Sequence, residues 1–192
     1  MLSRTRKNML KLLPLGLVLI ILFYYVIRQS NENNERLAIK DEWITIYQYK
    51  ADFESPGKVS FIPHDSIKFE GNHSAIITKD NLYGPTFFSD SLQIIKKINK
   101  LEVRCKLLSK TALKDMRFIA SVENEKGSVY WKSSGLGDKL KANEWGDAST
   151  YFEMDPHTFN DKGKLFLKVY LLNDKGEECV TDNFEIIAYQ RN

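Results

Sequence analysis

Side chains that could carry catalysis are few in this sequence and lie far apart. His64, His73 and His157 occupy turn-like contexts, without the H-x-x-x-H or mixed Cys/His spacing that holds a metal. The sequence has no G-x-S-x-G elbow, phosphate-binding loop or dinucleotide fingerprint. Glu123 and Glu125 lie two residues apart, but Glu125 falls at an expected hairpin turn, whereas a glycosidase needs two carboxylates that converge on its substrate. We therefore expect a protein that is not an enzyme.

Three aromatic residues are better candidates for binding chemistry. Tyr130 and Trp131 precede a polar, glycine-containing loop, and Trp145 follows it. Aromatic rings provide flat apolar surfaces on which the C–H face of a sugar can stack, and loops often carry binding residues. The pattern predicts ligand binding by Tyr130, Trp131 and Trp145. The alternative for the Trp131 ring is a place in the core.

Strands must position these residues, because a period of two dominates from Trp43 onward. Turn signals such as Glu-Lys-Gly at 125–127 and Asp-Lys-Gly at 174–176 separate the segments, and only 89–100 predicts a short helical stretch. Short strands at this spacing, without intervening long helices, predict an antiparallel β-sandwich, specifically a jelly roll. The expected strands are 43–49, 58–63, 66–71, 73–79, 83–89, 98–109, 115–124, 128–134, 147–154, 164–173 and 178–190.

Three short motifs stand at strand boundaries: Asp-Phe-Glu at 52–54, Gly-Asn-His-Ser-Ala at 71–75 and Thr-Asp-Asn-Phe-Glu-Ile at 181–186. In their order and spacing they resemble those of the galactose-binding-domain-like jelly rolls, which include many non-catalytic carbohydrate-binding modules. The resemblance implies a structural Ca²⁺ that joins the first and last strands of the domain through oxygen ligands. It also implies that Trp145 packs under the sheet. The implied metal ligands are Glu54, backbone oxygens around Gly71 and Ser74, and Asp182.

A different interpretation of the same motifs needs no metal. Gly71 would then be a turn glycine, and Asp182 would cap a strand and be solvated.

The state of the two cysteines also has two interpretations. Cys105 lies on the apolar side of an alternating segment, which predicts a small buried side chain, and the alternative is a disulfide with Cys179.

The N-terminal segment has the pattern of a membrane anchor. Residues 12–27 carry no charge, and 9–27 would span about 28 Å as a helix, close to the thickness of the bilayer core. No small-residue cleavage site follows, which favours an uncleaved anchor over a signal peptide. Four basic residues precede the apolar run and one follows it closely, so the positive-inside rule puts the N-terminus in the cytoplasm and the rest outside.

These observations divide the chain into a cytoplasmic basic tail (1–8), a transmembrane signal anchor (9–28), a linker (29–42) and a β-sandwich domain (43–192). Residues 1–30 carry a charge of +5, which leaves 23 basic and 25 acidic residues, a net of −2, for the remainder. A domain with that balance has no electrostatic footprint for nucleic acid.

We expect a single-pass membrane protein whose non-catalytic domain lies in the periplasm or outside the cell and binds glycan or polysaccharide. The alternative is a protein-interaction subunit of a cell-envelope complex, without a sugar ligand. The sequence does not specify the ligand or the oligomeric state.

Overall fold

The computed structural model describes residues 43–55, 57–111, 113, 115–136, 140–160 and 162–192. The expected tail (1–8), anchor (9–28) and linker (29–42) lie outside these residues. Within the described part of the chain, no helix is both long and apolar enough to cross a membrane. Residues 44–191 form one compact unit, and it contains the whole hydrophobic core described below.

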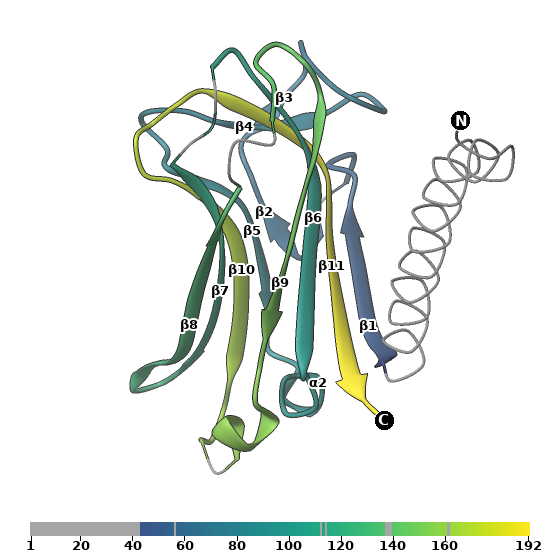
Figure 1. Ribbon diagram of the computed structural model, residues 1–192, viewed down its shortest axis with the longest axis vertical. Helices are drawn as coiled ribbons and strands as arrows, with labels where there is room; N and C mark the ends of the chain where they lie inside the picture. Colours follow the sequence, from purple (N-terminus) through teal and green to yellow (C-terminus); the bar gives the residue numbers. More distant parts are fainter. Residues whose placement is uncertain (1–42, 56, 112, 114, 137–139, 161) are drawn as a thin grey trace, which may run out of the picture. The chain divides into compact units, whose positions relative to one another are not determined.

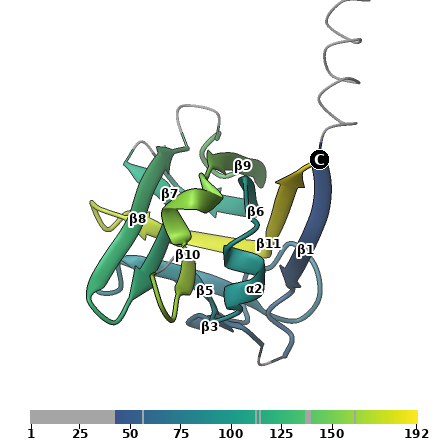
Figure 2. The ribbon, with the colours of Figure 1, turned by 90° about the horizontal axis from the view of Figure 1, so that it is seen from below.

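The described residues contain eleven strands and two short helical turns, joined by loops (Figures 1 and 2). A single 3₁₀ turn, η2, begins at Pro156, where the Asp155 carboxylate accepts a hydrogen bond from the His157 backbone N–H. The elements are β1 (Trp43–Ala51), β2 (Val59–Ser60), β3 (Pro63–His64), β4 (Ser74–Ile77), β5 (Tyr83–Ser89), α2 (Leu92–Ile95), β6 (Lys100–Ser109), β7 (Met116–Asn124), β8 (Gly127–Gly135), β9 (Gly146–Glu153), η2 (Pro156–Phe159), β10 (Phe166–Asn173) and β11 (Cys179–Arg191).

The strands form two sheets. Sheet A has the order β3-β4-β11-β6-β9, with β1 also paired to β11, and sheet B has the order β2-β5-β10-β7-β8. The pairs from β4 to β11 are nested and antiparallel: β4 with β11, β5 with β10, β6 with β9 and β7 with β8. Two more pairs, β6 with β11 and β7 with β10, complete the sheets. An eight-strand hairpin rolled up in this way is a jelly roll, so the predicted fold is confirmed.

The core lies between the two sheets because their inward residues are apolar. On β6 the buried residues Leu101, Val103 and Leu107 alternate with mostly charged residues on the other side, and on β10 the buried Leu167 and Val169 alternate with partly exposed residues. Fully burying a leucine or valine side chain contributes about 1.5–3 kcal/mol to stability. The alternation that predicted the strands therefore also stabilises the sandwich.

Both cysteines are buried and unpaired, so the prediction for Cys105 is confirmed. Cys179 lies opposite Ser109, four residues farther along β6 than Cys105. Four residues of extended strand span roughly 13 Å, about twice the Cα separation that a disulfide tolerates. Burial raises the pKa of the Cys105 thiol to about 12, which keeps it protonated and unreactive.

Two predicted strands differ from the structure. The segment 58–63 is divided between β2 in sheet B and β3 in sheet A, with residues 61 and 62 in neither. The segment 66–71 forms part of an irregular loop over residues 65–73, between β3 and β4. Most of its side chains are exposed, Ile67 and Phe69 among them. Its backbone N–H groups bind carboxylates from elsewhere in the chain, which replaces the hydrogen bonds of a strand ladder.

Candidate functional site

The outward face of sheet B collects aromatic side chains from three of its strands, β5, β10 and β8. Across the sheet, Phe88 on β5 lies opposite Lys168 on β10, which lies opposite Ser121 on β7 and then Trp131 on β8. Directly opposed residues in a sheet point to the same side, and this row points away from the core. Phe166 and Tyr170, each two residues from Lys168 on β10, share that side. We call this surface the aromatic face.

Two pairs of rings on the aromatic face are in contact, one of them through Tyr83 on β5, which lies opposite Leu172 on the same side of β10 as Tyr170. The Phe88 and Phe166 rings stack with centroids 5.5 Å apart, and the Tyr83 and Tyr170 rings lie 5.8 Å apart. Trp131 is 52% exposed, Phe88 44% and Tyr83 59%. A group of large exposed aromatic side chains on one face of a domain is typical of a binding surface.

A charged pair lies among these rings. The Lys168 Nζ atom donates to Glu123 Oε2 at 2.5 Å, and the Ser121 hydroxyl donates to Glu123 Oε1 at 3.3 Å. Both charged side chains are about one-third exposed, so their remaining donor and acceptor sites face outward. The aromatic face thus combines apolar rings with fixed hydrogen-bonding groups, the combination that a polyhydroxylated ligand requires.

The three predicted binding aromatics do not come together. Trp131 lies on the aromatic face, but its neighbour Tyr130 points to the core side of β8, where its hydroxyl donates to the Glu153 carbonyl at 3.1 Å. Burial raises the pKa of Tyr130 to about 12. Trp145 is half-buried, and its ring lies 5.6 Å from Phe69 in the irregular loop. Adjacent strand residues face opposite sides, so Tyr130 and Trp131 cannot form one platform.

Other residues of the aromatic face were missed at the sequence level. Phe166, Lys168 and Tyr170 alternate with Leu167 and Val169 along β10. That alternation places the first three together on one side, so the signal was present in the sequence. Which neighbouring strands lie beside them depends on sheet order, and a strand pattern does not contain that information.

The three motifs at 52–54, 71–75 and 181–186 do meet, around the loop 65–73. Glu54 Oε1 accepts hydrogen bonds from the backbone N–H groups of Asn72 at 2.5 Å and His73 at 2.9 Å. Asp182 Oδ2 accepts from Phe69 N–H at 3.0 Å and Glu70 N–H at 3.2 Å. Two carboxylates from distant parts of the chain therefore hold consecutive halves of the loop.

Gly71 and Ser74 complete this junction. Gly71 has a φ of +65°, and a Cβ atom there would lie 2.2 Å from Glu54 Oε1, so any other residue would be strained and would displace the Glu54 carboxylate. The Ser74 side chain is fully buried, and its hydroxyl lies 2.6 Å from the Ile67 carbonyl oxygen and 3.1 Å from that of His64. The glycine and serine that the resemblance singled out thus shape the loop.

The calcium implied by the resemblance can be compared with this arrangement. Glu54 accepts three N–H donors, counting the Asn72 side chain at 3.1 Å, and Asp182 also accepts three, counting Asn183 N–H at 2.7 Å. Donors that point their hydrogens at the carboxylates do not form the oxygen cage that Ca²⁺ prefers. Among the described residues there is also no group of three or more His, Cys, Asp or Glu side chains able to hold a metal. As they are arranged here, the four implied ligand residues do not fit a Ca²⁺ ion. The calcium therefore stays a prediction that rests on the resemblance alone.

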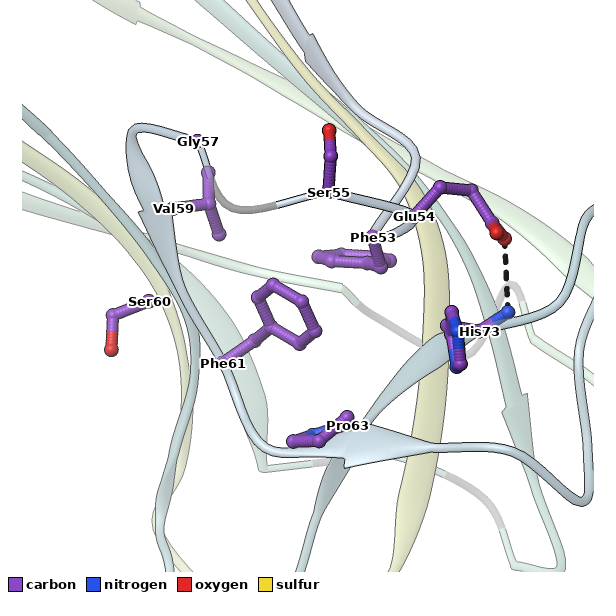
Figure 3. Close-up of a pocket in the computed structure, with 9 residues that line it drawn as sticks. All are labelled: Phe53, Glu54, Ser55, Gly57, Val59, Ser60, Phe61, Pro63 and His73. Atoms are coloured by element: carbon purple, nitrogen blue, oxygen red, sulfur yellow. Dashed lines mark hydrogen bonds between the residues drawn. The ribbon is translucent and has the colours of Figure 1, made fainter.

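A cavity of about 400 Å³ lies beside this junction, between the loop that follows β1 and strands β2 and β3 (Figure 3). We call it the loop pocket. The Phe53 and Phe61 rings are in contact at its wall, with centroids 4.7 Å apart, and Pro63 lies below them in the figure. Glu54 and His73 stand together at one side, joined by the hydrogen bond drawn in the figure.

Phe53 has an unusual backbone conformation. Its φ is +62°, in the left-handed region, although it is a bulky residue that is almost fully buried. Such a conformation costs on the order of 1–3 kcal/mol and persists only where the surroundings impose it; it is most common at functional sites. Here this conformation lets the Phe53 side chain point into the core while the next side chain, that of Glu54, points to solvent.

Comparisons with known proteins give only remote likenesses. No protein-family profile matches the chain, and no curated protein matches it. Similar solved structures include the CBM22-1 xylan-binding domain of Paenibacillus barcinonensis Xyn10C, at 14% identity over 79% of this chain and 87% of that one, with a TM-score of 0.46. Others are CBM35 from Cellvibrio japonicus Abf62, at 10% over 76% and 98% with a TM-score of 0.47, and the C-terminal CBM6 of LamC from Zobellia galactanivorans, at 13% over 74% and 99% with a TM-score of 0.39. Identities and TM-scores this low transfer neither a ligand nor a residue role to this chain.

Proposed function

We propose that this chain is a non-catalytic module, tethered to a membrane by its N-terminal segment, that binds glycan outside the cytoplasm through the aromatic face of sheet B. The observation that carries the proposal is the arrangement of Trp131, Phe88 and Phe166, partly open to solvent, around the Lys168–Glu123 pair. Rings supply stacking surfaces for sugar C–H faces, and the charged pair supplies hydrogen bonds to hydroxyl groups.

The outward face of sheet A has a different character, which favours sheet B as the binding surface. There Arg104 bonds Glu102 at 2.8 Å and approaches Glu185 at 3.8 Å, while Lys106 bonds Asp147 at 2.7 Å. Sheet B carries an ion pair of its own, Lys168–Glu123, so ion pairs alone do not distinguish the two faces. The exposed rings do: Tyr83, Phe88 and Trp131 are exposed on sheet B, against Tyr151 among the described residues of sheet A.

Tethering gives such a module a way to act with modest affinity. An open face contacts a sugar chain on one side only, so each contact is weak and exchange is fast. Holding many copies at one membrane surface raises their local concentration beside a polymer with repeated binding units. Overall attachment then exceeds the affinity of one domain without any additional contact.

The test uses the full-length chain in a detergent without a sugar headgroup, applied to an array of polysaccharides and oligosaccharides and then to calorimetry with the best ligands. We expect saturable binding that Trp131→Ala weakens by about 30-fold, the equivalent of roughly 2 kcal/mol for a central aromatic contact. The matched control is Tyr151→Ala, since Tyr151 is a 60% exposed aromatic residue on β9 of sheet A. Its affinity should equal that of the wild type.

Two results would count against the proposal. Absence of saturable binding to every glycan would remove it and favour the protein-interaction subunit. Equal losses in the Trp131 and Tyr151 variants would mean that the aromatic face is not the binding surface.

A further inference from the structure

A hydrogen bond and close packing hold one wall of the loop pocket against β1. The backbone N–H of Lys58 donates to the Tyr49 hydroxyl at 2.8 Å, which ties the loop to β1. Gly57 approaches the same hydroxyl so closely that a Cβ atom would lie 2.2 Å from it. The Tyr49 ring in turn packs 5.3 Å from the buried Phe87. A wall that is fixed in this way loses little conformational entropy when the cavity is filled.

Its polar side has unused hydrogen-bonding capacity. A carboxylate has about four acceptor sites, and the Glu54 carboxylate receives three donors. Hydrogen bonds from the backbones of His73 and Asn72 lower the pKa of Glu54, so it remains an ionised acceptor in mildly acidic solution. The His73 Nδ1 atom lies 2.7 Å from Asp65 Oδ1 and is the donor to that carboxylate, which leaves Nε2 for another partner.

The apolar side is formed by rings. Phe53 is almost fully buried and supports the partly buried Phe61, which is the ring available to the cavity. Figure 3 shows these rings on one side of the Glu54–His73 pair, and all four residues line the cavity. A ligand held here would have one apolar face and hydroxyl groups at its edge, and a pyranose ring has that construction.

We propose that the loop pocket is a second sugar site, which takes a single pyranose ring: a free monosaccharide or the terminal residue of a chain. The ring lies against Phe61, one hydroxyl donates to Glu54, and another bonds His73 Nε2. This inference rests on the proposed function, because it supposes that the module binds sugar. It adds a site whose preferred ligand differs in size from that of the aromatic face. The aromatic face extends across four strands and suits a chain, whereas a volume of about 400 Å³ lies near the lower end of ligand pockets.

Saturation-transfer difference NMR on the full-length chain, in the same sugar-free detergent, tests the inference with a panel of free monosaccharides. We expect at least one to give a saturable signal that falls at least fivefold in Phe61→Ala and in His73→Ala. Phe61 packs against the core, so its replacement could disturb the fold. The His73 side chain is 42% exposed, and its variant should melt within a few degrees of the wild type.

The outcomes separate this inference from the proposed function. Binding of oligosaccharides without binding of any monosaccharide would overturn the second site and leave the aromatic face standing. A monosaccharide signal lost in Trp131→Ala but kept in both loop-pocket variants would also overturn it, because the ring would then lie on the aromatic face. If neither oligosaccharides nor monosaccharides bind, both proposals are overturned.

Discussion

Replacing Asp182 by alanine should destabilise the domain far more than replacing an ordinary surface aspartate. Asp182 is 1% exposed and accepts three backbone N–H groups, from Phe69, Glu70 and Asn183. In Asp182→Ala these donors lose their acceptor, while the cavity left by so short a side chain is small.

The size of the loss follows from the environment of each donor. A hydrogen bond to a charged group contributes about 1.5–3 kcal/mol. Phe69 and Glu70 lie in an exposed part of the loop, so water can reach their N–H groups once the loop moves, whereas Asn183 is held within β11. We therefore expect a total loss of about 3 kcal/mol, less than three full hydrogen bonds. For a domain of this size that equals a decrease in Tm of roughly 6–12 °C.

The assay is urea and thermal unfolding of the full-length chain, followed by tryptophan fluorescence. Trp145 packs on Phe69, so its emission reports release of the loop as well as global unfolding. Asp147→Ala is the matched control: that carboxylate is 82% exposed and pairs with Lys106 at the surface, and its loss should cost at most about 1 kcal/mol. A loss below 1 kcal/mol in Asp182→Ala, or equal losses in the two variants, would refute the reasoning.

Three further predictions concern the same junction and the core. Because the pKa of Glu54 is held below its ordinary 4.5 by the N–H groups of residues 72 and 73, its contribution to stability is complete above 4.5 and lost as the pH falls through the lowered value. Glu54→Gln should therefore have a lower Tm at pH 7 and a shallower decline between pH 5 and 3. Gly71→Ala should lose about 2 kcal/mol in urea unfolding, from strain at φ +65° and the clash with Glu54, whereas the same change at Gly135, which has open space around it, should be nearly neutral. With a pKa of about 12 in place of 9, the Cys105 thiolate is about a thousandfold rarer than that of a free thiol. Ellman's reagent should therefore label Cys105 and the buried Cys179 only in urea, and prompt labelling of the native protein would contradict their burial.

Strand positions were predictable because each strand has one face in the core. The alternation of Leu101, Val103, Cys105 and Leu107 marks β6, and both predicted glycine turns, at 125–127 and 174–176, connect strands. The signal is local: it depends only on side-chain direction along an extended chain. It therefore does not show that the turn at 174–176 leads from sheet B to sheet A.

Two parts of the candidate site lay beyond such reasoning. The segment 66–71 has an acceptable strand composition, but Asp182 binds its backbone at residues 69 and 70. Glu54 binds the next two N–H groups, at 72 and 73, and the loop is held from both positions. Trp131 and Phe88 become members of one surface only through the order β5-β10-β7-β8. Both outcomes depend on long-range pairing, and the three motifs indicated that their segments meet without indicating by which bonds.

The place of β11 has a consequence for how the domain folds. The last strand of the domain lies inside sheet A, between β6 on one side and β4 and β1 on the other. The strands on the two sides of β11 become one sheet only when residues more than 70 positions apart, such as Leu101 and Ala188, pair with each other. Contacts so distant in sequence slow the search for the native topology. During synthesis the earlier strands must wait, with their apolar faces uncovered, for β11 to emerge, and in that interval the domain is most exposed to aggregation.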